Sequence, residues 1–213
     1  MLARTKGQPY ESFSSDGGKT WSNVTPCNMH IDKLALEAEK GANAGGGKAI
    51  IFNTITISDG ISMGHEGMRA SLVSRENIAD SYELVMHAER FDGAVTIAGC
   101  DKSLPGMMMA MLRLNVPAIF LYGCSIMPGK FHGKDVTVVD VFEGVGKHSA
   151  GAMSDEELFE LECVACPGAG ACGGQFTANT MAMVGEALGL SPLGSAMVPP
   201  TLPPVASVAC ASG

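Results

Sequence analysis

Short apolar runs, glycine-containing turns and amphipathic segments follow one another through the middle of this 213-residue chain. The clearest unit begins at residues 93–98 (GAVTIA), which predict a buried strand, and passes through Gly99-Cys100 into a Met-rich helical segment at 104–114. Residues 117–122 (PAIFLY) then predict a second buried strand. Repeated units of this kind predict an α/β fold in which helices cover both faces of a parallel sheet.

Other segments extend the pattern on both sides of this unit. Branched residues at 49–57 (AIIFNTITI) predict a further strand, which ends in the turn Ser58-Asp59-Gly60. Apolar periodicity predicts helices at residues 31–41, 67–91, 136–148, 154–165 and 176–190. We expect Asn28 to cap the first helix, and Ser154 and Glu157 to form a capping box at the start of the fourth.

Proline and small residues dominate the end of the chain after Ser191. The pairs Pro199-Pro200 and Pro203-Pro204 do not propagate a helix or a central strand. We therefore expect one α/β domain over residues 1–198, of which residues 1–20 are irregular, and a flexible tail over residues 199–213.

The composition indicates a globular protein, because 46% of the residues are hydrophobic and 17% are charged. A net charge of −8, without a basic stripe, argues against binding to nucleic acid. No charged leader precedes an apolar run, and no apolar stretch is long enough to span a bilayer. Seven cysteines in such a chain predict reduced thiols, and hence the cytoplasm, or an organelle stroma or matrix after loss of a transit peptide.

Two glycine-rich cysteine clusters carry the candidate chemistry: residues 99–106 (GCDKSLPG) and residues 166–179 (CPGAGACGGQFTAN). In the first cluster, Cys100 is followed at once by a carboxylate and a lysine, which is typical of a metal or cluster site. Cys27 offers another thiolate just before the first predicted helix. Ligands of parallel sheets sit beyond the carboxyl ends of the strands, so the pattern allows Asp59, Cys100 and Cys124 to share one site.

Three longer motifs resemble the dihydroxy-acid dehydratase and phosphogluconate dehydratase family. They are residues 53–64 (NTITISDGISMG), residues 100–107 (CDKSLPGM) and residues 170–190, from GACGGQFTA to EALGL. The resemblance runs from about Trp21 to Pro199, and the sequence TPCN at 25–28 is most similar to the branched-chain members. It implies a hydro-lyase that removes water from a 2,3-dihydroxy acid to give a 2-keto acid, in branched-chain amino-acid biosynthesis.

The resemblance also implies the ligands. An iron–sulfur cluster, 2Fe-2S rather than 4Fe-4S, would be held by Cys27, Cys100 and Cys172. A magnesium ion would be held by Asp59, Asp101 and Lys102, the last as a carbamate. The chemistry agrees, because thiolates suit iron–sulfur clusters and carboxylate oxygens suit magnesium.

The resemblance further implies a homodimer and a small dihydroxy-acid substrate. Chains of the family are longer, and their β-rich second domain supplies a further magnesium ligand and the base. We therefore expect an N-terminal or truncated chain without that domain. We assign no catalytic residue and expect the isolated chain to be inactive or nearly so.

The sequence leaves three alternatives open. One is a sugar-acid dehydratase of the same family, and another is a non-catalytic metal-binding remnant. The third is a zinc or electron-transfer module that uses Cys163, Cys166 and Cys172. Against that module, residues 158–165 read as a helix, so we expect Cys163 to pack in the core. Cys124 is expected to line the site without being a ligand.

Overall fold

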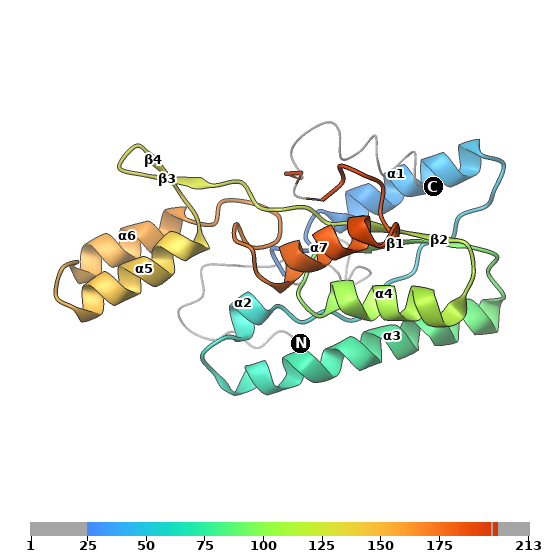
Figure 1. Cartoon of the computed structure of the whole chain (residues 1–213), viewed down its shortest axis with the longest axis horizontal. Helices are drawn as coiled ribbons and strands as arrows, with labels where there is room; N and C mark the ends of the chain where they lie inside the picture. Colours follow the sequence, from blue (N-terminus) through green and yellow to red (C-terminus); the bar gives the residue numbers. More distant parts are fainter. Residues whose placement is uncertain (1–24, 197, 200–213) are drawn as a thin grey trace, which may run out of the picture.

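The computed structural model of the chain describes residues 25–196, 198 and 199 (Figure 1). The predicted irregular segment 1–20 and the predicted tail from residue 200 onward lie outside these residues. In chain order the elements are α1 (Ile31–Ala44), α2 (Asp59–Ser62), η2 (Glu66–Met68), α3 (Arg69–Glu89), β1 (Ala94–Ala98), α4 (Ser103–Leu114), β2 (Ala118–Tyr122), β3 (Gly129–Phe131), β4 (Lys134–Val136), α5 (Val138–Ser149), α6 (Asp155–Val164) and α7 (Thr177–Ala187).

A parallel pair of strands forms the centre of the fold. β1 pairs with β2 from Ala94 opposite Ala118 to Ala98 opposite Tyr122. Side chains alternate across the sheet, so Phe120 and Tyr122 pack with α4 and α7, whereas Leu121 packs with Leu34 of α1. Helices thus cover both faces of the parallel sheet, which confirms the predicted α/β class (Figure 1).

The prediction of a strand at residues 49–57 is wrong. The segment forms no strand, and a cavity of about 720 Å³, which residues of α1 and α3 also line, lies between the segment and β1. Phe52 stacks on Tyr82 and Phe91, with ring centroids 5.8 and 6.3 Å apart. These ring contacts tie the segment to α3 and its C-terminal end rather than to the open edge of β1. The turn predicted at Ser58-Asp59-Gly60 is instead the start of the four-residue helix α2, which begins at Asp59.

The longest helix, α3, packs along α4 and forms the outer layer below the sheet (Figure 1). Gly106 allows this close approach, because a Cβ there would lie 2.8 Å from the carbonyl oxygen of Arg75. Ala79 on α3 and Ala110 on α4 are fully buried between the two helices. Small residues therefore bring the N-terminal end of α4, which follows Cys100, against the start of α3.

A second group of elements, β3, β4, α5 and α6, extends to the left in Figure 1. The β3–β4 hairpin was not expected from the sequence, and it delays the start of α5 to Val138. The capping box of Ser154 and Glu157 is confirmed at the start of α6. Val136, Leu161 and Ala165 form a small core of their own in this group.

Candidate metal and cluster site

The loops that carry Cys27, Cys100 and Cys172 lie against one another. The Gly170 N–H donates to the carbonyl oxygen of Pro26 at 3.1 Å, which joins the third loop to the first. A Cβ on Gly99 would collide with the carbonyl oxygen of Cys27, so the second loop also packs on the first with no space for a side chain. The main chain thus brings together segments separated by more than seventy residues.

Two of these loops lie at the end of the parallel sheet. Cys100 is the second residue after the end of β1 and is buried. Beyond β2, the Ala171 N–H donates to the carbonyl oxygen of Cys124 and the Ile126 N–H donates to that of Ala171, both at 2.8 Å. This short bridge places Cys172 at the same carboxyl edge of the sheet as Cys100, where parallel sheets bind ligands.

The three thiols influence one another electrostatically. The hydrogen bond between Cys27 and Cys100 raises the pKa of Cys27 and lowers the pKa of Cys100. The charges of Cys100 and Cys172 also raise the pKa of Cys27. Burial, together with the charge of Asp101, raises the pKa of Cys172 to about 11. Thiolates crowded in this way are unfavourable by themselves, and a bound cationic group would relieve the repulsion.

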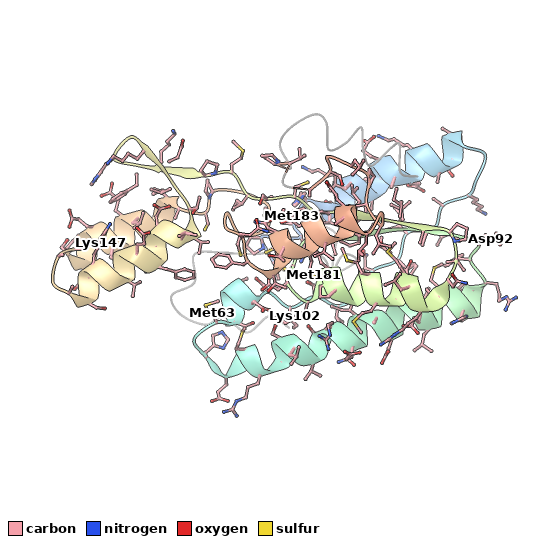
Figure 2. The ribbon with its side chains drawn as sticks, viewed as in Figure 1. Met63, Asp92, Lys102, Lys147, Met181 and Met183 are labelled. Carbon is pink, nitrogen blue, oxygen red and sulfur yellow. The ribbon has the colours of Figure 1, made fainter. Side chains whose placement is uncertain are left out.

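Asp59, Asp101 and Lys102 form a second group next to the thiols. The Lys102 Nζ lies 2.5 Å from Oδ2 of Asp59, and the Oδ1 of Asp59 accepts a hydrogen bond from Ser71. Burial, followed by the charge of Asp59 and a hydrogen bond with it, raises the pKa of Asp101. Lys102 is 17% exposed and lies at the N-terminal end of α4, on the side of α2 (Figure 2). The structure therefore places a lysine and two carboxylates together at this edge.

Across residues 25–196, 198 and 199, no three His, Cys, Asp or Glu side chains are arranged to hold one metal ion. The thiolates and carboxylates nevertheless suit an iron–sulfur cluster and a magnesium ion. Different irons of a cluster bind different cysteines, so three thiolates need not converge on one point. Mg²⁺ keeps several water ligands and needs only one or two carboxylates from a protein, which Asp59 and Asp101 would supply, and a carbamate on Lys102 would add a further oxygen ligand.

The other cysteines that the structure describes, Cys124, Cys163 and Cys166, have different surroundings. Cys163 is exposed on α6, so the prediction that it packs in the core is wrong. Leu161 and Ala165 take the buried positions of that helix end instead. Cys166 packs against this same small core, and its charge contributes to the raised pKa of Cys172. Burial raises the pKa of Cys124 to about 12, which is typical of an unreactive structural thiol.

Two buried asparagines contact the cysteine loops, and neither role was predicted from the sequence. Asn28 does not cap α1, because His30 occupies the N-cap position and makes no side-chain cap bond. The amide of Asn28 instead lies 3.1 Å from the Cys100 sulfur. Asn179 donates hydrogen bonds to the carbonyl oxygens of Cys172 and Gly174. The available signal was their position, since each lies inside or beside a cysteine motif.

Residues 18–213 match the family model described as dihydroxy-acid/6-phosphogluconate dehydratase N-terminal. The chain belongs to this family. Curated relatives named dihydroxy-acid dehydratase include those of Parvibaculum lavamentivorans (63% identical over 179 residues), Natronomonas pharaonis (63% over 178 residues) and Koribacter versatilis (59% over 180 residues). Each alignment covers 84% of this chain but only 30–31% of the relative. The chain thus spans about a third of the length of these dehydratases, in their N-terminal family region.

Among the helices of the described residues, none combines the length and the apolar character that crossing a membrane requires.

Proposed function

We propose that this chain is the cluster- and cation-binding part of a dihydroxy-acid dehydratase. Such an enzyme is a hydro-lyase that converts a 2,3-dihydroxy carboxylic acid into a 2-keto acid, here for branched-chain amino-acid biosynthesis. The relatives named dihydroxy-acid dehydratase, at 59–63% identity, support this assignment. The observation that carries it is that the two groups of candidate ligands meet in one turn. Asp101 and Lys102 directly follow Cys100, the Lys102 Nζ lies 2.5 Å from Oδ2 of Asp59, and Gly99 packs on the carbonyl oxygen of Cys27.

Cys27, Cys100 and Cys172 would hold an iron–sulfur cluster, which the resemblance favours as 2Fe-2S. Asp59, Asp101 and a carbamate of Lys102 would hold Mg²⁺. When bound, these groups supply Lewis acids, one for the departing hydroxyl and one for the substrate carboxylate and the other hydroxyl. The chain itself orients one of these ligands, since Ser71 donates a hydrogen bond to Oδ1 of Asp59, which is 8% exposed.

Lys102 has a direct bearing on this site. As an ammonium it is held in an ion pair with Asp59 and would repel a divalent cation. Carbamylation by carbon dioxide would remove that positive charge, release Asp59 and create an oxygen ligand. We therefore expect magnesium binding to depend on carbon dioxide in the parent chain and to be absent in Lys102→Met, as measured by calorimetric titration.

The main test is anaerobic rebuilding of the cluster with iron and sulfide, followed by iron analysis and absorption spectroscopy. Cys100→Ser should abolish iron retention, whereas Cys163→Ser is the matched control and should retain it, because Cys163 is exposed on α6. Zinc binding without iron, or equal iron loss in both variants, would contradict the proposal.

Activity gives the second test, in which formation of the 2-keto acid from 2,3-dihydroxy-3-methylbutanoate is measured with magnesium under anaerobic conditions. A positioned general base contributes about 10²–10⁴-fold, and the resemblance assigns no base to residues 1–213. Turnover should therefore be far below that of a full-length relative. Turnover equal to the relative's would show that the base lies within this chain.

The proposal includes a homodimer and a location in the cytoplasm or in an organelle stroma or matrix. Sedimentation velocity on the chain tests the dimer, and a monomer at all concentrations would remove that part of the proposal alone.

A further inference from the structure

The carboxamide of Asn28 joins the first two cysteine loops. Asn28 is 2% exposed and lies between Cys27 and α1. Its Oδ1 accepts a hydrogen bond from the Gly99 N–H at 3.0 Å. Its Nδ2 lies 2.8 Å from Thr25 Oγ1, 3.0 Å from Thr56 Oγ1 and 3.1 Å from the Cys100 sulfur. One side chain therefore contacts the backbone before Cys100 and the sulfur of Cys100 itself.

The three partners of the Asn28 amide differ in whether they can donate a hydrogen bond or only accept one. A threonine hydroxyl can rotate and donate, and Thr25 Oγ1 lies 3.5 Å from the Cys100 sulfur while Thr56 Oγ1 lies 3.1 Å from Ser103 Oγ. A thiolate sulfur has no hydrogen and can only accept. The arrangement therefore suits Cys100 as an anionic ligand that receives an N–H from Asn28.

We propose that Asn28 is a positioning residue that fixes the Gly99-Cys100 turn and donates a hydrogen bond to the Cys100 sulfur, raising the reduction potential of the cluster held there. This inference rests on the proposed function. Reduction adds negative charge to the cluster and its sulfur ligands, and an N–H dipole directed at a sulfur stabilises that charge. The same bond, together with the one to Gly99, holds Cys100 in place and slows the loss of iron.

The variant Asn28→Leu tests both parts, because leucine keeps the branched, neutral shape but has neither donor nor acceptor. In the rebuilt protein we expect the midpoint potential to become more negative by about 59 mV. This shift corresponds to a tenfold change in the one-electron equilibrium constant. Iron release to a chelator should be faster than in the parent. Asn43→Leu is the control, since Asn43 is exposed near the end of α1, and it should change neither quantity.

Hydrogen exchange of the Gly99 amide in the cluster-free protein gives a separate measurement. Exchange should be faster in Asn28→Leu and close to the parent in Asn28→Asp, which keeps the oxygen that accepts the Gly99 N–H. Circular dichroism establishes that each variant is folded, and Asn28→Ser replaces Asn28→Leu if the latter does not fold.

A folded variant with the parent's potential and the parent's Gly99 exchange would overturn the inference. Faster exchange with an unchanged potential would reject the bond to sulfur and leave only a structural role. If the parent chain itself takes up no iron, the proposed function fails, while the exchange measurement still decides whether Asn28 holds the Gly99 turn.

Discussion

Asn179 uses both ends of its carboxamide inside the protein, where it is 1% exposed on α7. Its Oδ1 accepts hydrogen bonds from the Tyr122 hydroxyl and, at 2.9 Å, from Ser125 Oγ. Its Nδ2 donates to the carbonyl oxygens of Cys172 at 2.8 Å and Gly174 at 2.5 Å. The substitution Asn179→Ala removes all four bonds, which join α7 to the end of β2 and to the loop of Cys172.

The expected loss of stability follows from these contacts. Each net hydrogen bond contributes about 1 kcal/mol, so the four together contribute about 4 kcal/mol. Alanine regains about 0.5 kcal/mol through its higher helix propensity. Tyr122 is 1% exposed, so its hydroxyl cannot turn to bulk water in compensation. We therefore expect the free energy of unfolding to fall by about 3–4 kcal/mol.

Urea unfolding of the cluster-free protein, followed by circular dichroism, measures this change. Asn77→Ala is the matched control, because Asn77 is exposed on α3 and the chemical change is the same. The control should stay within about 0.5 kcal/mol of the parent. A loss below about 1 kcal/mol in Asn179→Ala, with an unchanged denaturant slope, would refute the assignment of these bonds to stability.

Three further predictions concern glycine packing, a buried hydroxyl and a helix cap. In urea unfolding, Gly99→Ala should lower the unfolding free energy by about 2 kcal/mol or more, because the new Cβ meets the carbonyl oxygen of Cys27. The control Gly146→Ala lies in open space on α5 and should raise the unfolding free energy by up to about 1 kcal/mol. Burial raises the pKa of Tyr82 to about 12, and its buried hydroxyl finds no partner among the described residues. The folded state therefore holds this proton more tightly than the unfolded chain, so stability falls as pH rises from about 10 to about 12. Tyr82→Phe should remove that part of the alkaline slope in thermal melts at a series of pH values, and an unchanged slope would contradict it. Ser154→Ala should cost about 1 kcal/mol in the same urea assay through loss of the capping box, and no loss would show that the box is without effect.

Local patterns in the sequence determined most of the elements. The apolar runs at 93–98 and 117–122 became β1 and β2, and the capping box at Ser154 marks the start of α6, because strand burial and helix capping depend on neighbouring residues. The long motifs around Cys100 and Cys172 were sufficient to predict the family. The ligand roles of Cys27, Cys100 and Cys172 and of the magnesium group stay predictions.

Tertiary contacts decided what the local patterns could not. Residues 49–57 have the composition of a strand, but Phe52 stacks on rings from α3 and from Phe91, and the segment does not pair with β1. Asn28 has the position of a cap, but its carboxamide contacts Gly99 and Cys100, which are more than seventy residues away. A side chain's role at such a site depends on which distant groups the fold brings within hydrogen-bonding distance, and periodicity along the chain carries no information about that.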